Sequence, residues 1–414
     1  MSLPVLSHNA HLIELRTPAD LAVELAAVRE PSRAAVREWE QVRLAVLRLE
    51  KVSPALRSAL GALTGDPGRG VRLYGNGPSL LLAGSRFALR GLAEALRAGG
   101  QAAGAAIEGC LIDGPGQWRW GSRVLDFREG ARVMGVLNCT PDSFYPASRR
   151  PGLEAALEAA RAMIAEGAHI LDVGGESTRP GSDPVPAAEE IRRVVPVLEA
   201  VRRESEVLLS VDTRKPEVAE AALAAGADIL NDISALRADR VGGEGSGGTN
   251  GAPGEARQGG RRMAALAARH GVPLILMHMR GEPKTMQVEP HYQDVVSEVL
   301  AELAEAVAFA AESGVDKLIV DPGIGFGKRL QDNLCLLKNL PALRALGCPV
   351  LVGLSRKSFL GAVSGAPVEE RLPATVAGNT LAMLGGADIV RVHDVREAVQ
   401  GATLLRAVLG AGCR

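Results

Sequence analysis

Three features that are typical of exported and membrane proteins are missing from this sequence. No apolar run reaches the roughly 18 residues that a membrane-spanning helix needs. The N-terminal stretch has no basic start followed by an apolar segment, so no secretory signal is visible. The five cysteines are scattered and form no Cys-x-x-Cys pair, which argues against a disulfide framework and a structural zinc site. We therefore expect a cytoplasmic protein with reduced thiols.

An excess of one charge is also missing. The 47 Lys and Arg residues against 48 Asp and Glu residues give a formal net charge of −1, which offers no broad basic field for nucleic acid. The 414 residues, 47% of them hydrophobic, suit a globular protein of two domains or one large domain with additions. Lysine is scarce, with only seven residues against 40 arginines. Four lysines nevertheless fall in the motif-bearing loops described below: Lys215, Lys284, Lys328 and Lys357.

Residues 1–115 predict a small α/β or helical accessory domain without a catalytic constellation. The pattern indicates helices at about 18–30 and 33–50, strands at 71–76 and 79–84, and a helix from Ser85 to about 98. Gly114-Pro115-Gly116 is a plausible boundary, and residues 118–127 alternate apolar and polar side chains like a hairpin. No role follows from the sequence of this segment.

The rest of the chain, residues 116–414, alternates short apolar runs with helical patterns. The runs lie at 133–138, 169–174, 207–212, 227–232, 273–278, 317–322, 349–354 and 387–392. Continuously apolar strands are buried on both faces, as in a parallel sheet. Eight strand–helix units predict a (β/α)₈ TIM barrel; an open doubly wound sheet is the alternative. The Gly-rich stretch 237–262 interrupts the rhythm and predicts a flexible inserted loop.

Polar residues follow nearly every predicted strand, where the active site of such a barrel lies. They are Asn138, Asp172, Asp212, Asn231, Asp232, His278, Asp321, Ser355, Arg356, Lys357, Arg391 and His393. Carboxylate and amide groups at several strand ends suit a flat nitrogen heterocycle, because a carboxylate can accept two N–H groups at once. The cations Arg179, Lys328, Lys357, Arg391 and His393 suit a phosphorylated or acidic partner. We expect Asp172 to be structural rather than catalytic.

Seven motifs in order make residues 118–414 resemble the dihydropteroate synthase family. They are LNCTPDSF (137–144), GGESTRPGS (174–182), SVDTRKPEVAEAALAAGADILNDIS (210–234), LMHMRGEPKTMQ (276–287), VDPGIGFGK (320–328), GLSRKSFLG (353–361) and RVHDV (391–395). The resemblance implies a TIM barrel that joins 6-hydroxymethyl-7,8-dihydropterin pyrophosphate to p-aminobenzoate, releases pyrophosphate and is inhibited by sulfonamides. It also implies Mg²⁺ as cofactor and a homodimer formed through the last helices.

The resemblance also implies roles for individual residues. Asp212, Lys357, Arg391 and His393 are the expected catalytic residues, with Asp212 beside a cationic pterin. Asn138 would lie near the metal. Substrate contacts are expected from Phe144, Thr178, Arg179, Pro180, Asp212, Asn231, Met277, Asp321, Phe326, Gly353, Lys357, Ser358 and Arg391.

One loop departs from the family pattern, which continues SFSDGG where this chain reads Ser143-Phe144-Tyr145-Pro146-Ala147-Ser148. The role of the missing Asp therefore cannot be carried over. Two other functions stay open on sequence alone. A pterin-binding methyltransferase would share the Asp and Asn residues but has no need of the pyrophosphate motifs, and a degenerate paralogue would bind without turnover.

Overall fold

The computed structural model describes residues 9–13, 45–50, 52–64, 71–75, 79–84, 86–101, 103, 104, 107, 116–139, 149–177, 182–236, 253–281 and 285–410. The chain divides into two compact units. One comprises residues 1–115 with 294–304 and 338–348, and the other comprises residues 116–293, 305–337 and 349–414. The division between residues 115 and 116 falls within the Gly114-Pro115-Gly116 stretch.

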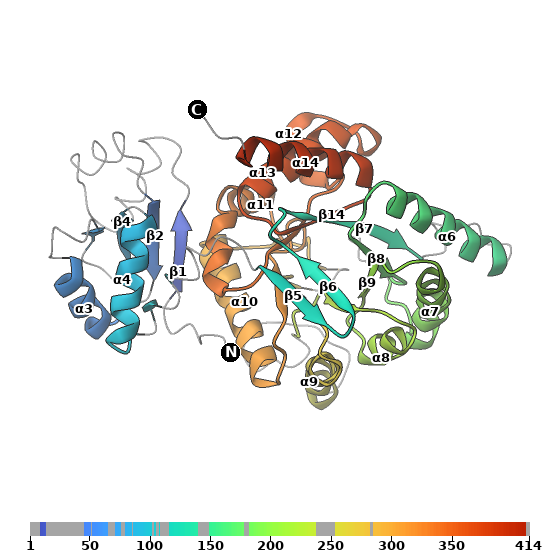
Figure 1. Ribbon diagram of the computed structural model, residues 1–414, viewed down its shortest axis with the longest axis horizontal. Helices are drawn as coiled ribbons and strands as arrows, with labels where there is room; N and C mark the ends of the chain where they lie inside the picture. Colours follow the sequence, from blue (N-terminus) through green and yellow to red (C-terminus); the bar gives the residue numbers. More distant parts are fainter. Residues whose placement is uncertain are drawn as a thin grey trace. The chain divides into compact units, whose positions relative to one another are not determined.

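The N-terminal segment contains an antiparallel sheet and two helices (Figure 1). Its elements are β1 (Asn9–Ile13), β2 (Ala45–Glu50), α3 (Pro54–Thr64), β3 (Val71–Tyr74), β4 (Leu80–Gly84) and α4 (Arg86–Ala98), and the strand order is β1-β2-β4-β3. The predicted strands at 71–76 and 79–84 and the helix after Ser85 are confirmed. Buried leucines from β2, β4, α3 and α4 form the core of this segment.

The helix predicted over 33–50 is wrong at its end, because residues 45–50 form strand β2. Leu47 and Leu49 are buried and alternate with Arg48 and Glu50, which is the two-residue period of a strand. The helix predicted over 18–30 and the rest of 33–50 lie outside the described residues.

The second unit is the predicted TIM barrel (Figure 1). Its parallel strands are β7 (Arg132–Asn138), β8 (Ile170–Gly174), β9 (Leu208–Asp212), β10 (Ile229–Asp232), β11 (Leu274–Met277), β12 (Leu318–Asp321), β13 (Leu351–Gly353) and β14 (Ile389–Val392). They run in the order β12-β11-β10-β9-β8-β7-β14-β13. The backbone N–H of Val320 donates to the carbonyl of Pro349 at 2.9 Å, and a parallel bridge joins Val320 to Val350. These contacts between β12 and β13 close the sheet into a barrel and exclude the open alternative.

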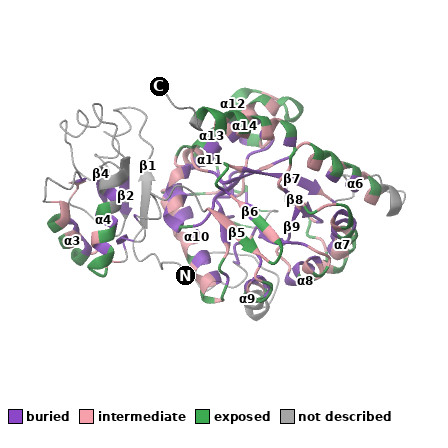
Figure 2. Ribbon diagram, in the orientation of Figure 1, coloured by how far each residue is buried: buried purple, intermediate pink, exposed green. Residues whose placement is uncertain are grey.

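Helices follow the strands, and those of the second unit surround the barrel. They are α6 (Arg149–Ala165), α7 (Ala187–Glu204), α8 (Pro216–Ala224), α9 (Pro253–His270), α10 (Val295–Glu312), α11 (Leu330–Lys338), η4 (Leu340–Leu346), α12 (Ser358–Ser364), η5 (Val368–Glu370), α13 (Leu372–Leu384) and α14 (Val395–Gly410). In Figure 2 the barrel strands are buried along most of their length, and the helices around them carry exposed residues. None of the described helices is long and apolar enough to cross a membrane.

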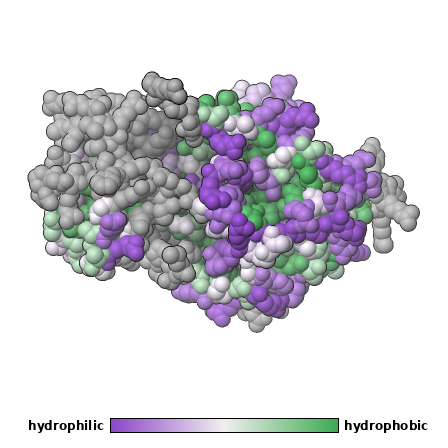
Figure 3. Space-filling model, in the orientation of Figure 1, coloured by the Kyte–Doolittle hydropathy of each residue, from purple (hydrophilic) through white to green (hydrophobic). Residues whose placement is uncertain are grey.

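A hairpin covers one end of the barrel. Strands β5 (Gln117–Trp120) and β6 (Arg123–Asp126) pair in antiparallel fashion, which confirms the hairpin predicted at 118–127. Leu125 and Phe127 pack on a layer of apolar side chains to which every barrel strand gives one residue near its start: Met134, Ile170, Leu208, Ile229, Ile275, Ile319, Leu351 and Ile389. Hydrophobic surface in the middle of this face lies between hydrophilic side chains (Figure 3). The barrel interior is therefore packed shut at this end.

The loop predicted over 237–262 is wrong in its last part, because α9 begins at Pro253. The Glu, Ala, Arg, Gln and Met residues of α9 favour a helix more than its glycines oppose one. Met263, Ala264 and Ala267 are buried and fix the later turns to the barrel. Residues 237–252 lie outside the described residues.

Candidate active site

The inward-facing residues at the strand ends form one cluster because side chains alternate between the two faces of a strand. Asp212 ends β9 and is paired in register with Asn231 of β10. Asp321 ends β12 opposite Met277 of β11, and Arg391 of β14 lies opposite Gly353 of β13. These three pairs bring residues from six different strands to the same end of the barrel.

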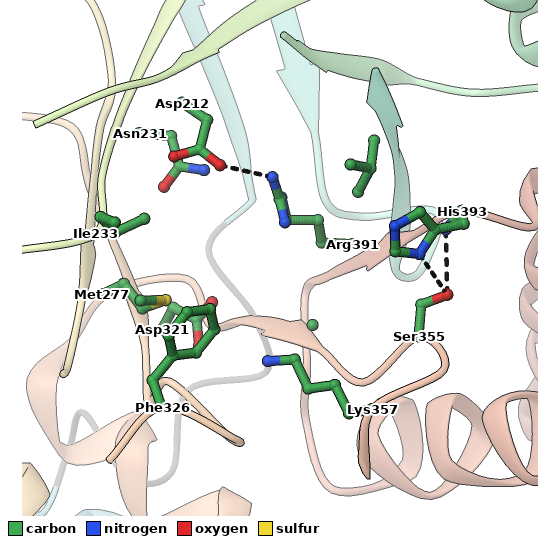
Figure 4. Close-up of a pocket in the computed structure, with 12 residues that line it drawn as sticks. Asp212, Asn231, Ile233, Met277, Asp321, Phe326, Ser355, Lys357, Arg391 and His393 are labelled. Carbon is green, nitrogen blue, oxygen red and sulfur yellow. Dashed lines mark hydrogen bonds and ion pairs between the residues drawn. The ribbon is translucent and has the colours of Figure 1, made fainter. Parts of the chain in front are cut away.

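A cavity with about 470 Å³ of empty space lies among these side chains (Figure 4). It is lined by Val136, Asp212, Asn231, Ile233, Met277, Asp321, Phe326, Gly353, Ser355, Lys357, Arg391 and His393. All four residues predicted as catalytic are in this set, together with five of the predicted substrate contacts: Asn231, Met277, Asp321, Phe326 and Gly353.

Arg391 is fixed by two carboxylates. Its Nε donates to Asp172 Oδ2 at 2.6 Å, and its Nη2 donates to Asp212 Oδ2 at 2.7 Å (Figure 4). Burial acts to lower the pKa of Arg391, but the charges of Asp172 and Asp212 outweigh it and raise that pKa above its usual value. The guanidinium is therefore permanently charged and held in one orientation inside the cavity.

Asp172 does not line the cavity but holds two residues that do. It is fully buried, and its Oδ2 also accepts a hydrogen bond from Asn231 Nδ2 at 3.0 Å. One oxygen thus joins Asn231 of β10 to Arg391 of β14. This agrees with the prediction that Asp172 acts through structure, and it defines that role as positioning of the two neighbours.

Burial raises the pKa of both carboxyl groups that line the cavity. The pKa of Asp212 rises to about 7, with Asp172 adding to the increase and Arg391 opposing it. Burial also raises the pKa of Asp321, although the charge of Lys357 and the N–H of Gly323, 2.7 Å from Oδ1, act in the opposite direction. Each carboxylate would therefore gain strongly from a ligand that brings N–H donors or positive charge.

Stability without ligand should reflect the pKa of Asp212. Its carboxyl binds a proton more tightly in the folded protein, at about 7, than in the unfolded chain, at 3.8. The stability that it contributes is therefore present below about pH 4 and is lost as the pH rises through 7. We expect the free energy of unfolding of wild type, minus that of Asp212→Asn, to fall between pH 5 and pH 8 in urea titrations. A difference that stays constant over this range would contradict the assignment.

Lys357 and Phe326 form another wall of the cavity. Lys357 Nζ lies 4.4 Å from the centre of the Phe326 ring and donates to the carbonyl of Ile324. Burial lowers the pKa of Lys357 to about 8, while the charge of Asp321 opposes this effect. At neutral pH the ammonium is charged but poorly solvated, so an anionic or carbonyl oxygen in the cavity would be a favourable partner.

Lys328 has a different role from the one predicted, since it does not face the cavity. Its Nζ is buried and donates to the carbonyls of Gly323 and Phe326, both at 3.0 Å. It also lies 3.0 Å from Nδ1 of His278. Lys328 therefore holds the Gly-rich loop in shape rather than balancing a phosphate, and His278 supports it instead of facing the ligand.

Removal of the Lys328 ammonium should destabilise the loop that carries Phe326. In Lys328→Met the carbonyls of Gly323 and Phe326 lose a buried donor, at a cost of about 1–3 kcal/mol for each unpaired group. We expect a lower urea midpoint than wild type and a higher KM. Lys317→Met, which removes a lysine bonded to the adjacent Asp316, is the control and should lower the midpoint less. Equal midpoints for the two variants would refute the role of Lys328.

Two other predicted residues also face away from the cavity. Asp232 accepts from the backbone N–H groups of Ser234 and Leu236 and caps the turn after β10. Arg356 is paired with Asp394 at 2.7 Å. Asp232 follows Asn231 within β10, so its side chain points to the opposite face of the strand. Arg356 lies in the turn after β13, with a φ of 55°. Among the remaining motif lysines, Lys215 pairs with Glu176 and Glu190, and Lys284 lies outside the described residues.

His393 lies at the exposed end of the cavity. Its ring Nδ1 is 3.0 Å from Ser355 Oγ, and its backbone N–H donates to the same oxygen at 3.2 Å (Figure 4). Ser355 therefore fixes both the backbone and the ring of His393. The ring stays open to solvent while its orientation is set, which suits contact with a charged group at the rim.

The remaining predicted residues divide into two groups. Asn138 ends β7 and Ser358 begins α12, and neither lines the cavity. Phe144, Thr178, Arg179 and Pro180 lie outside the described residues, so their predicted roles stay predictions. The predicted contact set lacked Val136, Ile233 and Ser355, although each lies two positions from an inward-facing residue. Two-residue alternation applied to every strand would have found them.

Comparison with known proteins places this site in a family. The family model of pterin binding enzymes matches residues 134–393. The dihydropteroate synthase of Bacillus subtilis is 42% identical over 291 residues, which are 70% of this chain and 92% of that protein. A solved structure of Xanthomonas albilineans dihydropteroate synthase with 4-aminobenzoic acid matches with a TM-score of 0.62 and 42% identity, over 72% of this chain and 99% of that one.

A sulfonamide complex is also among the similar structures. The Yersinia pestis dihydropteroate synthase in that complex has a TM-score of 0.61 and 38% identity, over 71% of this chain and 100% of that one. The matching residues include every strand of the barrel except the first two residues of β7. The chain therefore belongs to the pterin-binding enzymes, among the dihydropteroate synthases, which are transferases.

Proposed function

We propose that this chain condenses 6-hydroxymethyl-7,8-dihydropterin pyrophosphate with p-aminobenzoate to give 7,8-dihydropteroate and pyrophosphate. The observation that carries the proposal is the separation of charge within one cavity. Asp212, Asn231 and Asp321 offer acceptors on one side, whereas Lys357 and His393 offer donors on the other (Figure 4). A heterocycle that is rich in N–H groups and carries a phosphorylated arm would satisfy both sets of groups.

The pterin ring would lie among the buried acceptors. We assign its aminopyrimidinone edge to Asp321, whose carboxylate can accept two parallel N–H bonds. Asn231 supplies a further amide from β10, and Met277 supplies apolar contact for the ring. Because Arg391 is neutralised by Asp172 and Asp212, we assign its planar guanidinium to stacking on the pterin rather than to the phosphates.

The reaction separates charge, and the cavity holds groups for both halves. Breaking the bond from the pterin CH₂ carbon to the pyrophosphate oxygen leaves positive charge on the pterin and both electrons on the leaving group. Asp212 stabilises the pterin cation, and His393 at the rim binds the departing pyrophosphate. The amine of p-aminobenzoate then forms the new C–N bond and loses a proton to solvent. Lys357 and Phe326 would line the p-aminobenzoate position.

Magnesium would be held mainly by the substrate. Among the described residues, no three His, Cys, Asp or Glu side chains are placed to hold a metal ion together. Mg²⁺ keeps several waters and commonly takes its other ligands from substrate phosphates. The amide oxygen of Asn138, at the end of β7, fits a single protein ligand of this kind. The ion would contribute charge neutralisation of the leaving pyrophosphate.

The direct test is pyrophosphate release by the purified protein with dihydropterin pyrophosphate and Mg²⁺, with and without p-aminobenzoate. We expect release that depends on p-aminobenzoate, formation of dihydropteroate, and competitive inhibition by a sulfonamide. The result would also show that the Tyr145-Pro146 form of the first loop supports catalysis. Folded protein that binds the pterin but forms no dihydropteroate would overturn the proposal.

We also propose that the chain forms a homodimer through α13 and α14. Leu381 and Leu384 on α13 and Leu404 and Val408 on α14 are exposed, by 43%, 56%, 67% and 60%. Four large apolar side chains on two neighbouring helices form a patch that association would remove from water.

Light scattering during gel filtration tests this interface. Wild type should have twice the mass of one chain, and Leu384→Arg combined with Leu404→Arg should have the mass of one chain, because two charges would be buried without partners. Val288→Arg, at an apolar residue that is 74% exposed elsewhere, is the matched control and should remain dimeric. A monomeric wild type would refute the proposal.

A further inference from the structure

A second hollow lies at the opposite end of the barrel from the active site. It is an open groove with about 1410 Å³ of empty space between the β5–β6 hairpin, the start of β7 and the ends of α6 and α7. It is lined by Ser122, Arg123, Val124, Leu125, Asp126, Arg132, Ile164, Ala168, His169, Ser205, Glu206, Val207 and Leu208. The reaction proposed above does not use it.

Arg132 brings a guanidinium with unsatisfied hydrogen-bond donors to this groove, and only a long ion pair with Glu129 balances its charge among the described residues. The residue is 9% exposed, and its Nε and Nη2 are buried without a hydrogen-bond partner among the described residues. The nearest carboxylate is Glu129, with its Oε2 3.9 Å from Nη2 and its side chain 67% exposed. Burying a guanidinium without hydrogen-bond acceptors costs folding free energy. The described residues of the groove therefore lack an acceptor for these donors of Arg132.

The other arginines near the groove do have carboxylate acceptors for their N–H groups. Arg123 donates to Asp228 at 2.8 Å and pairs with Glu206. Arg202 also pairs with Asp228, and Arg128 pairs with Asp126. The acidic groups around the groove are therefore already engaged by other arginines. Within the part of the chain that the structure describes, the groove has room for negative charge beside Arg132.

His169 supplies an N–H group beside the same charge. Its Nδ1 accepts a hydrogen bond from the backbone N–H of Val133 at 3.1 Å, so the neutral ring carries its proton on Nε2. Burial, together with the nearby charge of Arg132, lowers the pKa of His169 to about 4. At neutral pH the ring is therefore an uncharged donor next to a charged one.

We propose that this groove binds a small oxyanion, with the guanidinium of Arg132 and the Nε2–H of His169 as its donors. Phosphate and carboxylate groups share the needed chemistry, since both accept charge-assisted N–H bonds. Free phosphate and a small carboxylic acid are the two possible sources. The inference does not depend on the proposed reaction, because the groove and the cavity are lined by different residues.

The test follows the ring signals of His169 by NMR in histidine-labelled full-length protein at pH 7. His169→Gln identifies the signal among those of the seven histidines. Inorganic phosphate and acetate are titrated separately at constant ionic strength set with chloride. We expect a saturable shift of the His169 signals with at least one of the two anions. A shift with phosphate alone would identify free phosphate as the ligand class, and a shift with acetate alone would identify a small carboxylic acid. No shift with either anion would overturn the proposal.

Variants then test the part played by Arg132. Arg132→Leu should weaken anion binding by at least tenfold, yet be as stable as wild type without anion because it removes an unpaired buried charge. Arg132→Gln serves the same comparison if the leucine variant does not fold. Arg128→Gln removes a nearby arginine that is 62% exposed and paired with Asp126, and it should bind like wild type. Unchanged binding in the Arg132 variants would refute the site.

Discussion

Replacement of Asp212 by asparagine is expected to reduce kcat/KM by about 10²–10³, the range found when one preorganised electrostatic group is removed. The substitution keeps the size of the side chain and removes its negative charge, which lies inside the cavity next to Arg391. If Asp212 stabilises the pterin cation, kcat should fall more than the substrate affinity changes. Steady-state kinetics with both substrates varied measure the two effects.

Asp232→Asn is the matched control for this experiment. It makes the same chemical change one residue after Asn231, on a side chain that caps a turn and does not line the cavity. Asparagine can still accept from Ser234 through its amide oxygen but not from Leu236 as well, so the variant should lose some stability while its kcat stays close to that of wild type. Equal losses of activity in both variants would mean that the charge of Asp212 has no special role.

Replacement of Arg391 by alanine should damage both stability and catalysis. It leaves Asp172 and Asp212 as buried carboxylates without their cation, and loss of one partner of a buried pair costs about 3–5 kcal/mol. It also frees Asn231, because Asp172 would lose the partner that fixes its position. We expect a lower urea midpoint and almost complete loss of dihydropteroate formation.

Arg391→Lys separates charge from geometry. Lysine keeps the positive charge but cannot donate to two carboxylates from a planar fork. It should recover part of the stability and little of the activity. A lysine variant with wild-type kcat would show that Arg391 contributes only charge, and an alanine variant with wild-type stability would show that the ion pairs with Asp172 and Asp212 are weak.

Much of the barrel was predictable because its strands are buried on both faces. Runs such as VLLSVD and KLIVDP are mostly apolar and carry an Asp at or near their end. One run therefore predicts both the position of a strand and the polar residue that ends it. Asp212, Asp321 and Arg391 line the cavity at the strand ends that these runs indicate. The same argument failed for His278 and Asp232, which stand one position out of phase with the inward-facing residues and point away from the cavity.

Other features depend on contacts that the sequence does not display. Lys328 resembled a phosphate ligand because it follows a Gly-rich loop, but its function comes from carbonyls that only the folded loop brings together. Asp172 links two strands whose residues lie 59 and 219 positions away along the chain. Strand β2 was taken for a helix because its alternation is short and follows a region rich in helix-forming residues.

The β5–β6 hairpin, which packs on the apolar layer at the strand starts, affects the order in which substrates bind and leave. Leu125 and Phe127 close that end, so among the described residues the interior is open on the side of His393. Whatever occupies the buried acceptors Asp212 and Asn231 must enter before anything that rests nearer the rim, and it must leave afterwards. A sequential kinetic scheme with a compulsory order is the expected consequence of this arrangement.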